Sequence, residues 1–472
     1  PFAVDTLPFP RHNGRATMRT RPSILFRGHV AIPPLAGFRN MSPSTRLAVL
    51  AAVLAFVLSA CGRSPAPAPA KPGAPAAGGQ TTLTFWHIIT YTDVLDKAVA
   101  RFEQAHPGVK VKVETFDNDS FKQKLNVEMA SDSPPDVFFT WGGGALQAHV
   151  RAGRVLDLTD AMKAGWADGF VPAALNFGRF DGRLYAAPLD LACVPVWYNA
   201  SLFEKHNAAP PKTWDEFMAL CAKFRAAGVT PLALGNRQRW PGAFYFVYLA
   251  ARLGGTDLFF NAAGRKPGAS FEDPAFIAAG ERLVAMTRAK CFDPGVNGIE
   301  DDDARTRFLN GQAAMYLMGT WVVARAQKER PEFLPNLRLF PFPVVEGGKG
   351  DASTVVGGVN CAFAVSRKCQ RPDLAIELLK ALTAAEVAEA WAGIGRIPAV
   401  RISAQALERL PAPTRAAFDL LQAAKTIQPY YDQYLPPRLA EVHKDTTLEL
   451  LAGALSPADA ARQMEQAARR EK

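Results

Sequence analysis

The sequence predicts an α/β fold in two lobes, each a mostly parallel sheet flanked by helices. From Thr81 onward, short strand-like runs alternate with amphipathic helical runs, which is typical of parallel βαβ units. About 390 residues follow that point, more than a single hydrophobic core usually holds. Hydrophobic residues make up 49% of the chain and charged residues 21%, as in an ordinary globular protein.

The first elements of this body show the alternation clearly. Strand segments are rich in β-branched and aromatic residues or alternate with period 2, and helical segments place apolar residues on one face. The expected segments are 81–87 (strand), 94–108 (helix ending at Pro-Gly), 109–116 (strand) and 121–141 (helix, Pro-Pro break, buried strand). Open parallel sheets bind ligands at the carboxyl ends of their strands. Trp86, Asp117 and Trp141 each fall at or just beyond such an end.

Residues 41–60 are predicted to be a secretory signal peptide. Arg46, behind a possible start at Met41, precedes an apolar run shorter than the roughly 20 residues that span a bilayer. The run ends in Leu-Ser-Ala-Cys, which resembles the lipobox of bacterial lipoproteins and implies that Cys61 is lipidated and becomes the mature N-terminus. An ordinary signal peptide with a chance cysteine and a transmembrane anchor are the alternatives.

The segments on either side of the signal peptide have no strand or helix pattern. We interpret residues 1–40 as upstream sequence outside the mature protein, because they precede a far better start. Residues 61–80 are almost wholly Pro, Ala and Gly, and such a linker is extended and semi-rigid. The expected protein is exported and lipid-anchored to a bacterial membrane, facing the periplasm or the cell exterior.

Charge and cysteine content exclude other classes of partner. The formal net charge is +10, but residues 1–60 hold seven Arg and one Asp (+6), which leaves +4 for the rest. That charge is too small and scattered to predict nucleic-acid binding. Five cysteines follow Cys61, and their spacing fixes no pairing and fits no metal site. We expect buried structural thiols, with one disulfide as an option, and neither metal nor cofactor.

Seven segments of the body resemble, in order, the family 1 extracellular solute-binding proteins that serve ABC importers of carbohydrates and include the maltose-binding protein. The segments are LTFWH, FEQAHPGVKVKVE, KLNVEMASDSPPDVFF, DGRLYAAPLDLACVPVWYNASLFEKH, PPKTWDEFMALCAKFRAAG, RFLNGQAAMYLMGTW and, more weakly, GIGRIPAV. None is diagnostic alone, but their order over most of the span from Thr81 to Ala467 is specific.

The resemblance implies a periplasmic-binding-protein fold of type II, with a ligand cleft between two lobes. Strands that pass between the lobes act as hinges, and we expect them near Leu189–Val194 and in VVGGVNCAFAVS, whose paired glycines tolerate changes of φ and ψ. The implied lobes are residues 81–190 with 361–390, and residues 191–360 with 391–472.

The implied function is capture of a sugar or short oligosaccharide by lobe closure, followed by delivery to the permease subunits of an ABC transporter. Such a protein acts as a monomer and has no catalytic residue. Closure follows when the ligand touches both lobes, because the ligand then binds the closed state better.

The ligand site is expected to use aromatic platforms. A sugar ring has an apolar C–H face and a rim of hydroxyls, which suit a flat Trp surrounded by planar polar groups. Trp321 matches the position at which the family stacks an aromatic residue on the sugar, and the glycines after Trp141 would let backbone N–H groups approach the ligand. The candidate ligand-binding residues are Trp86, His87, Asp117, Trp141, Asp190, Trp240, Trp321, Asn360 and Arg396. Asn236, Arg237 and Gln238 are further rim candidates.

Two other functions remain open at this stage. A glycan-acting enzyme would need two carboxylates about 5 to 10 Å apart, but we interpret the acidic run 300–303 as the favourable N-terminus of a helix. A binding protein for another solute, such as glycerol phosphate or a polyamine, is the second alternative. Arg237, Arg239 and Arg396 are the cations that a phosphate would need.

Overall fold

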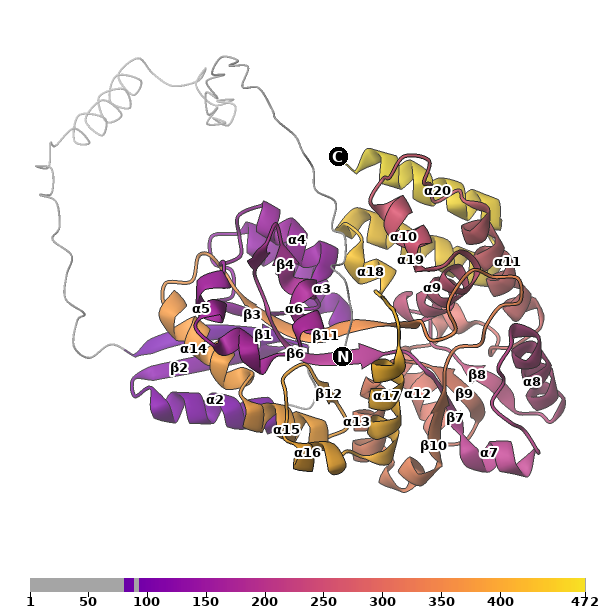
Figure 1. Cartoon of the computed structure of the whole chain (residues 1–472), viewed down its shortest axis with the longest axis horizontal. Helices are drawn as coiled ribbons and strands as arrows, with labels where there is room; N and C mark the ends of the chain where they lie inside the picture. The colour runs from indigo at the N-terminus through magenta and orange to yellow at the C-terminus, as the bar shows by residue number, and fades with distance from the viewer. Residues whose placement is uncertain (1–79, 89–92, 472) are drawn as a thin grey trace, which may run out of the picture. The chain divides into compact units, whose positions relative to one another are not determined.

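The chain forms two main β-sheets with helices packed on them (Figure 1). The computed structural model describes residues 80–88 and 93–471. The strands of the larger sheet are β1 (Thr81–His87), β2 (Val109–Thr115), β3 (Val137–Thr140), β6 (Ala187–Cys193), β11 (Val355–Val365), β12 (Ile397–Pro398) and β13 (Ile427–Gln428). The strands of the smaller sheet are β7 (Val196–Asn199), β8 (Thr230–Ala233), β9 (Ala313–Leu317) and β10 (Leu337–Phe340). A separate pair joins β4 (Arg179–Phe180) to β5 (Arg183–Leu184).

We call each sheet with its helices a lobe, the larger sheet defining the first lobe and the smaller sheet the second. The helices of the first lobe are α2 (Asp93–Ala105), α3 (Asn118–Ala130), α4 (Gly143–Arg151), α5 (Thr159–Lys163), α6 (Pro172–Leu175), α14 (Pro372–Leu382), α15 (Ala385–Gly393) and α16 (Ala404–Glu408). The other helices are α7 (Ala200–Lys205), α8 (Trp214–Ala226), α9 (Trp240–Gly254), α10 (Thr256–Ala263), α11 (Pro274–Arg288), α12 (Asp301–Leu309), α13 (Trp321–Glu329), α17 (Ala412–Ala423), α18 (Tyr431–Tyr434), α19 (Pro437–Ala452) and α20 (Pro457–Arg470). Short 3₁₀ helices are η2 (Trp166–Gly169), η3 (Asn176–Gly178), η4 (Val296–Gly298) and η5 (Pro331–Asn336).

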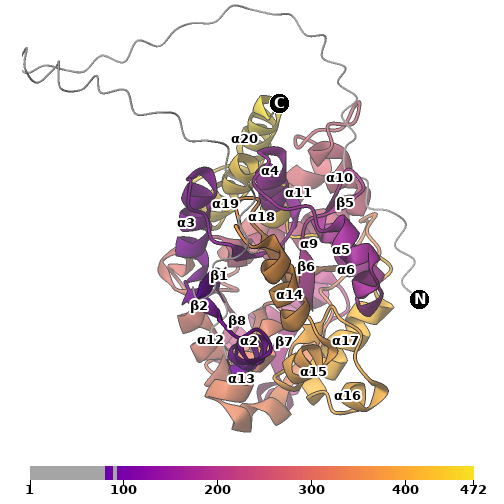
Figure 2. The ribbon, with the colours of Figure 1, turned by 90° about the vertical axis from the view of Figure 1, so that its left-hand side faces the viewer.

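The first lobe is a layered α/β structure. Helices α3 and α4 lie on one side of the larger sheet and α2 and α15 on the other, as both views show (Figures 1 and 2). Helix α2 buries Leu95, Val99 and Phe102, which recur at the spacing of one helical face. The helix ends at Ala105, just before the predicted Pro-Gly stop, and Gly108 takes the left-handed conformation there with φ of 88°.

Strand pairing is more mixed than the alternation of strands and helices predicted. The larger sheet runs β12-β6-β11-β3-β1-β2, and the smaller runs β10-β7-β9-β8. Parallel pairs join β1 to β2 and to β3, whereas β11 is antiparallel to both β3 and β6. The reason is that β6 leads out to the second lobe and β11 leads back from it, so the two run in opposite directions side by side.

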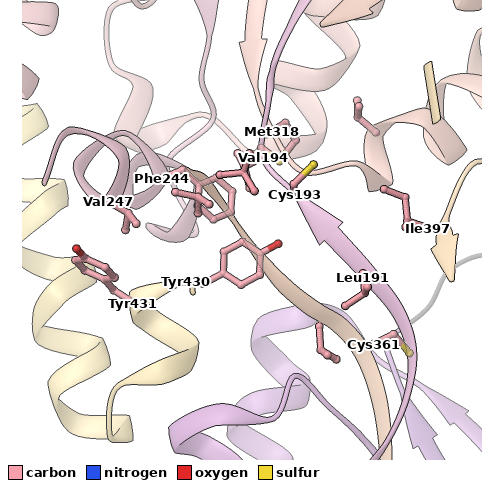
Figure 3. Close-up of a cluster of buried hydrophobic side chains, with 14 of the residues drawn as sticks. Leu191, Cys193, Val194, Phe244, Val247, Met318, Cys361, Ile397, Tyr430 and Tyr431 are labelled. Atoms are coloured by element: carbon pink, nitrogen blue, oxygen red, sulfur yellow. The ribbon is translucent and has the colours of Figure 1, made fainter. Parts of the chain in front are cut away.

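Strands β6 and β11 carry the chain between the lobes. Only Val194 and Pro195 separate β6 from β7 in the other sheet, which agrees with the first predicted crossing. Figure 3 shows Val194 and Cys193 packed near Phe244 and Tyr430. The hydroxyl of Tyr248 donates to the carbonyl oxygen of Val194 at 2.7 Å, so side chains of the second lobe fix this crossing.

The glycines predicted for the return crossing are needed for close approach. A Cβ on Gly357 would lie 2.4 Å from the carbonyl oxygen of Ala192, and one on Gly358 would lie 2.6 Å from the ring of Phe177. Strand β12 also pairs with β6 in the larger sheet, although residues from 391 onward are predicted for the second lobe. The lobe limits given above stay a prediction.

Several predictions concern parts of the chain or features outside these sheets. The signal peptide, the tether and Cys61 lie outside the described residues. Among the described helices, none is long and apolar enough to cross a bilayer. Within residues 80–88 and 93–471, no group of three or more His, Cys, Asp or Glu is placed to hold a metal ion. The five cysteines of this part are buried and free, as the buried-thiol prediction requires.

Candidate ligand-binding cavity

A cavity of about 560 Å³ lies between the two lobes, a size usual for small-molecule sites. The lining residues from the first lobe and its crossing strand are Ile88, Phe116, Asp117, Asn118, Asp119, Lys122, Phe139, Trp141, Asn360 and Arg396. Those from the rest of the chain are Arg237, Gln238, Trp240, Phe244, Glu300, Asp301, Asp302, Arg305, Trp321, Arg325, Tyr430, Asp432 and Gln433. A molecule in this cavity would therefore touch both lobes.

The structure brings six of the nine predicted ligand-binding residues to this cavity. They are Asp117, Trp141, Trp240, Trp321, Asn360 and Arg396. The other three lie outside its lining. Trp86 and His87 belong to β1, which spans the predicted residues 81–87, and both side chains are buried by neighbouring elements. Asp190 is wholly buried behind the cavity wall.

Trp86 and His87 have structural surroundings. The ring of Trp86 packs on Phe116 with centroids 4.9 Å apart, and the ammonium of Lys124 lies 4.6 Å from the centre of the Trp86 ring. Burial lowers the pKa of His87 to about 4, an effect that the nearby Asp96 carboxylate partly opposes. His87 is therefore neutral at physiological pH and contacts Phe85 within the sheet.

Trp321 is placed by the loop that precedes it. Strand β9 ends at Leu317, and Trp321 begins helix α13. A Cβ on Gly319 would lie 2.0 Å from the Trp321 ring, so the ring occupies the space that any other side chain would need. The N–H of Thr320 donates to the carbonyl oxygen of Cys193 at 3.0 Å, which fixes this loop to the first crossing strand.

Trp240 begins helix α9 and is held by an ion-paired loop. Arg239, directly before it, has a positive φ of 67°. Its guanidinium bonds to Glu441 at 2.9 Å and to Asp445 at 2.5 Å, both on α19, and these contacts stabilise the unusual backbone. Asn236 is buried and accepts the N–H of Gly242 at 2.9 Å, so it serves the loop instead of the cavity.

Four aromatic rings gather on the second-lobe wall of the cavity. The Trp240 and Trp321 rings meet edge to face with centroids 6.1 Å apart, and Phe244 lies 5.5 Å from Trp240 and 6.3 Å from Trp321. Tyr430 follows at 5.6 Å from Phe244. Trp240 and Trp321 are only partly buried by these contacts, so part of each ring is open to the cavity.

Trp141 stands on the first-lobe wall. Its ring packs edge to face on Phe139, with centroids 4.6 Å apart, and the Lys122 ammonium lies 4.7 Å from its centre. Burial lowers the pKa of Lys122, and Asp432, 3.8 Å away, opposes that shift. One Trp thus faces the aromatic group of the other lobe across the cavity.

The three glycines after Trp141 have a role other than the one predicted. A Cβ on Gly142 would lie 2.3 Å from the carbonyl oxygen of Phe177, and one on Gly143 would lie 2.3 Å from that of Gln433. The start of α4 therefore packs directly on the backbone near α18. The glycines bring protein segments together, which replaces our expectation that they admit a ligand.

The carboxylates of the two walls have different surroundings. Asp117 is the N-cap of α3, where it accepts the N–H of Ser120 at 2.9 Å, and these hydrogen bonds lower its pKa. Asp301, in the first turn of α12, is buried, and this burial raises its pKa to about 6 despite a hydrogen bond from the hydroxyl of Tyr316. The acidic run thus starts a helix, as predicted, and also lines the cavity.

Each basic residue of the cavity lining is paired with a carboxylate. The pairs are Lys122–Asp432 at 3.8 Å, Arg237–Glu300 at 2.8 Å, Arg305–Asp302 at 2.5 Å, Arg325–Glu329 at 3.5 Å, and Arg396–Asp190. Asp117, Asp119 and Asp301 have no Lys or Arg nitrogen within 4 Å in the described part of the chain. The uncompensated charge of the lining is therefore negative.

Sequence reasoning missed several lining residues. Gln238 was a rim candidate, and its amide does reach the cavity, where it bonds to Glu300 and accepts the N–H of Asp301 at 3.2 Å. Nothing in the sequence marks Phe244 or Arg325 as a cavity residue, because each lies inside a helix whose periodicity predicts a buried face but not the elements that pack on that face. Tyr430 and Asp432 come from a segment with no recognisable motif.

Comparison with known proteins identifies the family. A family model described as bacterial extracellular solute-binding protein matches residues 89–389. The chain belongs to this family. This membership confirms the class predicted from the seven segments, a solute-binding protein rather than an enzyme.

Two relatives show how far the similarity of this solute-binding protein extends. An uncharacterized ABC transporter extracellular-binding protein of Pyrococcus horikoshii is 31% identical over 261 residues, 54% of this chain and 58% of that protein. The chain thus spans less than two thirds of that relative's length. The diacetylchitobiose binding protein of Streptomyces coelicolor is 28% identical over 427 residues, 86% of this chain and 93% of that protein.

Solved structures confirm the type II fold of this solute-binding protein. A protein from work on xylan utilization by the thermophilic bacterium Caldanaerobius polysaccharolyticus is 31% identical with a TM-score of 0.77, covering 82% of this chain and 99% of that chain. The maltose/maltodextrin-binding domain of Bdellovibrio bacteriovorus, bound to maltotriose, has a TM-score of 0.67 at 18% identity, covering 83% and 99%.

Proposed function

We propose that the protein is the substrate-binding component of an ABC-type carbohydrate importer. It captures a sugar or short oligosaccharide in the interlobe cavity, closes on it, and delivers it to the membrane permease as a monomer. The observation that carries this proposal is the pair of aromatic walls, with Trp141 on one lobe and Trp240 and Trp321 on the other. Apolar ring faces between polar rims match the two-sided chemistry of a sugar.

The relatives support a carbohydrate ligand. The chain is similar along most of its length to a diacetylchitobiose binding protein, and its fold matches a protein from work on xylan utilization. A cavity volume of about 560 Å³ suits a ligand of one to a few sugar rings. We therefore include oligosaccharides of chitin and xylan among the first ligands to test.

The arrangement of charges argues against an anionic solute. Arg237, Arg239 and Arg396, the cations that a phosphate would need, are each bonded to a carboxylate of the protein. A phosphate would have to displace one of these carboxylates. The uncompensated carboxylates Asp117 and Asp301 favour a different second candidate, a polyamine, whose ammonium groups they would attract.

A thermal-shift screen tests the proposal. The purified protein is heated with diacetylchitobiose, xylotriose, maltotriose and galactose, and with spermidine and glycerol 3-phosphate as controls. A ligand that binds only the folded state adds about 2.7 kcal/mol of stability at a hundredfold excess over Kd. We expect a shift with one or more sugars, recovered unchanged afterwards. A shift with spermidine alone would replace the sugar with a polyamine.

We further propose export through the signal peptide of residues 41–60 and lipid attachment at Cys61, which anchors the protein to the membrane through the proline-rich tether. The extracellular nature of the family supports export. Metabolic labelling with radioactive palmitate tests the anchor. Label should enter the wild type and be absent from Cys61→Ala, and equal labelling of both would contradict it.

A further inference from the structure

Asp190 lies where both crossing strands meet the loop that bears Arg396. It belongs to β6, and its backbone partners are Cys361 on β11 and Pro398 on β12. Its exposed fraction is 0%, and it does not line the cavity. A carboxylate buried at such a junction needs partners, because burying a charge without them is costly.

The partners of Asp190 come from three separate elements. Its Oδ2 accepts a hydrogen bond from Nε of Arg396 at 2.7 Å, a second from Nη2 of the same guanidinium, and one from Nε1 of Trp391 at 3.1 Å. Its Oδ1 accepts from Nδ2 of Asn360 at 3.4 Å. The guanidinium carbon of Arg396 also lies 5.4 Å from the centre of the Trp391 ring.

Two of these partners, unlike Asp190 itself, line the cavity. Arg396 and Asn360 both face it. The Nη1 group of Arg396 makes no hydrogen bond to any described residue, so its N–H donors are available to another acceptor. Asn360 sits where the β11–β6 register shifts between Val359 and Cys361, and such irregularities turn a side chain toward a binding site.

We infer that Asp190 is a positioning residue for ligand recognition: it holds the guanidinium of Arg396 and the amide of Asn360 in the orientation that donates hydrogen bonds to a bound sugar. The inference rests on the proposed function, since it assigns a role within the same cavity. Asp190 acts from behind the wall and ties both ligand-facing groups to the crossing strands. Its charge also neutralises Arg396, so the pair presents directed N–H groups without a net positive charge.

A double-mutant cycle tests this role. The variants are Asp190→Asn, Arg396→Met and the two combined, and the ligand is the sugar of the panel above that gives the largest thermal shift. We expect each single change to weaken sugar binding at least tenfold in calorimetry. The double variant should lose clearly less affinity than the sum of the two single losses, because Asp190 acts on the sugar partly through Arg396 and partly through Asn360. Full additivity of the two losses, or a Kd of Asp190→Asn within twofold of wild type, would overturn the inference.

A matched control separates positioning from stability. Glu465 on α20 is also a buried carboxylate with two arginine partners, Arg265 at 2.7 Å and Arg469 at 2.8 Å, and it lies outside the cavity lining. Glu465→Gln should lower the melting temperature and leave the Kd for sugar unchanged. If Asp190→Asn fails to fold, Asp190→Glu keeps the ion pair but displaces the guanidinium, and it should still weaken binding tenfold or more.

If no sugar of the panel binds, the proposed function is refuted, but the placement of Arg396 by Asp190 can still be tested without a sugar. In a crystal structure of ligand-free Asp190→Asn, we expect the Arg396 guanidinium to leave its place over Trp391. A guanidinium found in its original place would contradict the inference. The outcome therefore distinguishes failure of the positioning role from failure of the transport role.

Discussion

The two walls of the cavity are built from different chemistry. The second-lobe wall gathers Trp240, Phe244 and Trp321 in mutual contact, with Tyr430 against Phe244, whereas the first-lobe wall offers one indole, Trp141, with an ammonium over its ring. Two of the three tryptophans that line the cavity therefore lie on the second lobe, while Ile88, Phe116 and Phe139 add apolar side chains to the first. We infer that a sugar docks first on the second lobe and that closure then adds the groups of the first.

The largest expected effect is the loss of Trp321. Its partly open ring lies in the aromatic group, so Trp321→Ala should raise the Kd for the panel sugar more than a hundredfold, about 3 kcal/mol, as for aromatic residues at binding hot spots. Trp141→Ala should cost about tenfold. Calorimetry on both variants checks the comparison, with Trp214→Phe, a buried core residue outside the cavity, as control. Equal losses at Trp141 and Trp321 would show that neither wall dominates.

The second-largest effect is expected in the pH dependence of stability, through Asp301 on the second-lobe wall. The folded-state pKa of Asp301, raised by burial to about 6, lies above the value of an unfolded carboxyl near 3.8. The stability that this group contributes is present below pH 3.8 and is lost as pH rises through 6. The shift corresponds to about 3 kcal/mol over the whole titration, of which about 2 kcal/mol is lost between pH 4 and pH 7.

Asp301→Asn checks this assignment, because the amide has the shape of the carboxyl and does not titrate. Urea unfolding at pH 4, 5.5 and 7 should show that the free energy of unfolding of the variant increases, relative to that of the wild type, by about 2 kcal/mol as pH rises. Parallel curves for the two proteins would remove Asp301 as the titrating group. Asp117 should show the opposite sign, since its lowered pKa stabilises the protein above pH 3.8 and loses that effect as pH falls.

The smallest effect is expected on the first wall. Asp117→Ala removes the cap of α3 and should lower the free energy of unfolding by about 1 kcal/mol, whereas Asp117→Asn keeps a capping oxygen and should cost far less. Urea unfolding measures both. If Asp117→Asn also weakens sugar binding strongly, the carboxylate contacts the ligand in addition to capping the helix.

Local features of the sequence predicted a good part of this molecule. The alternation of strands and helices predicted the α/β class, whereas the first crossing near Leu189–Val194 was implied by the resemblance to the solute-binding family. Trp240 and Trp321 reach the cavity because each begins a helix directly after a loop at the end of a strand. Such positions depend on residues a few places away, which the sequence displays.

Tertiary structure alone decided which side chains face the cavity and what they do there. Asp190 was expected to touch the ligand, but its partner Arg396 lies 206 residues further along the chain and keeps it behind the wall. Trp86 lies one residue before the end of β1, where neighbouring elements cover its side chain. Asp301 belongs to an acidic run that the sequence marks only as a helix start, yet its buried side chain lines the cavity. Burial and long-range pairing depend on how distant segments meet, and a sequence of residues does not record those distances.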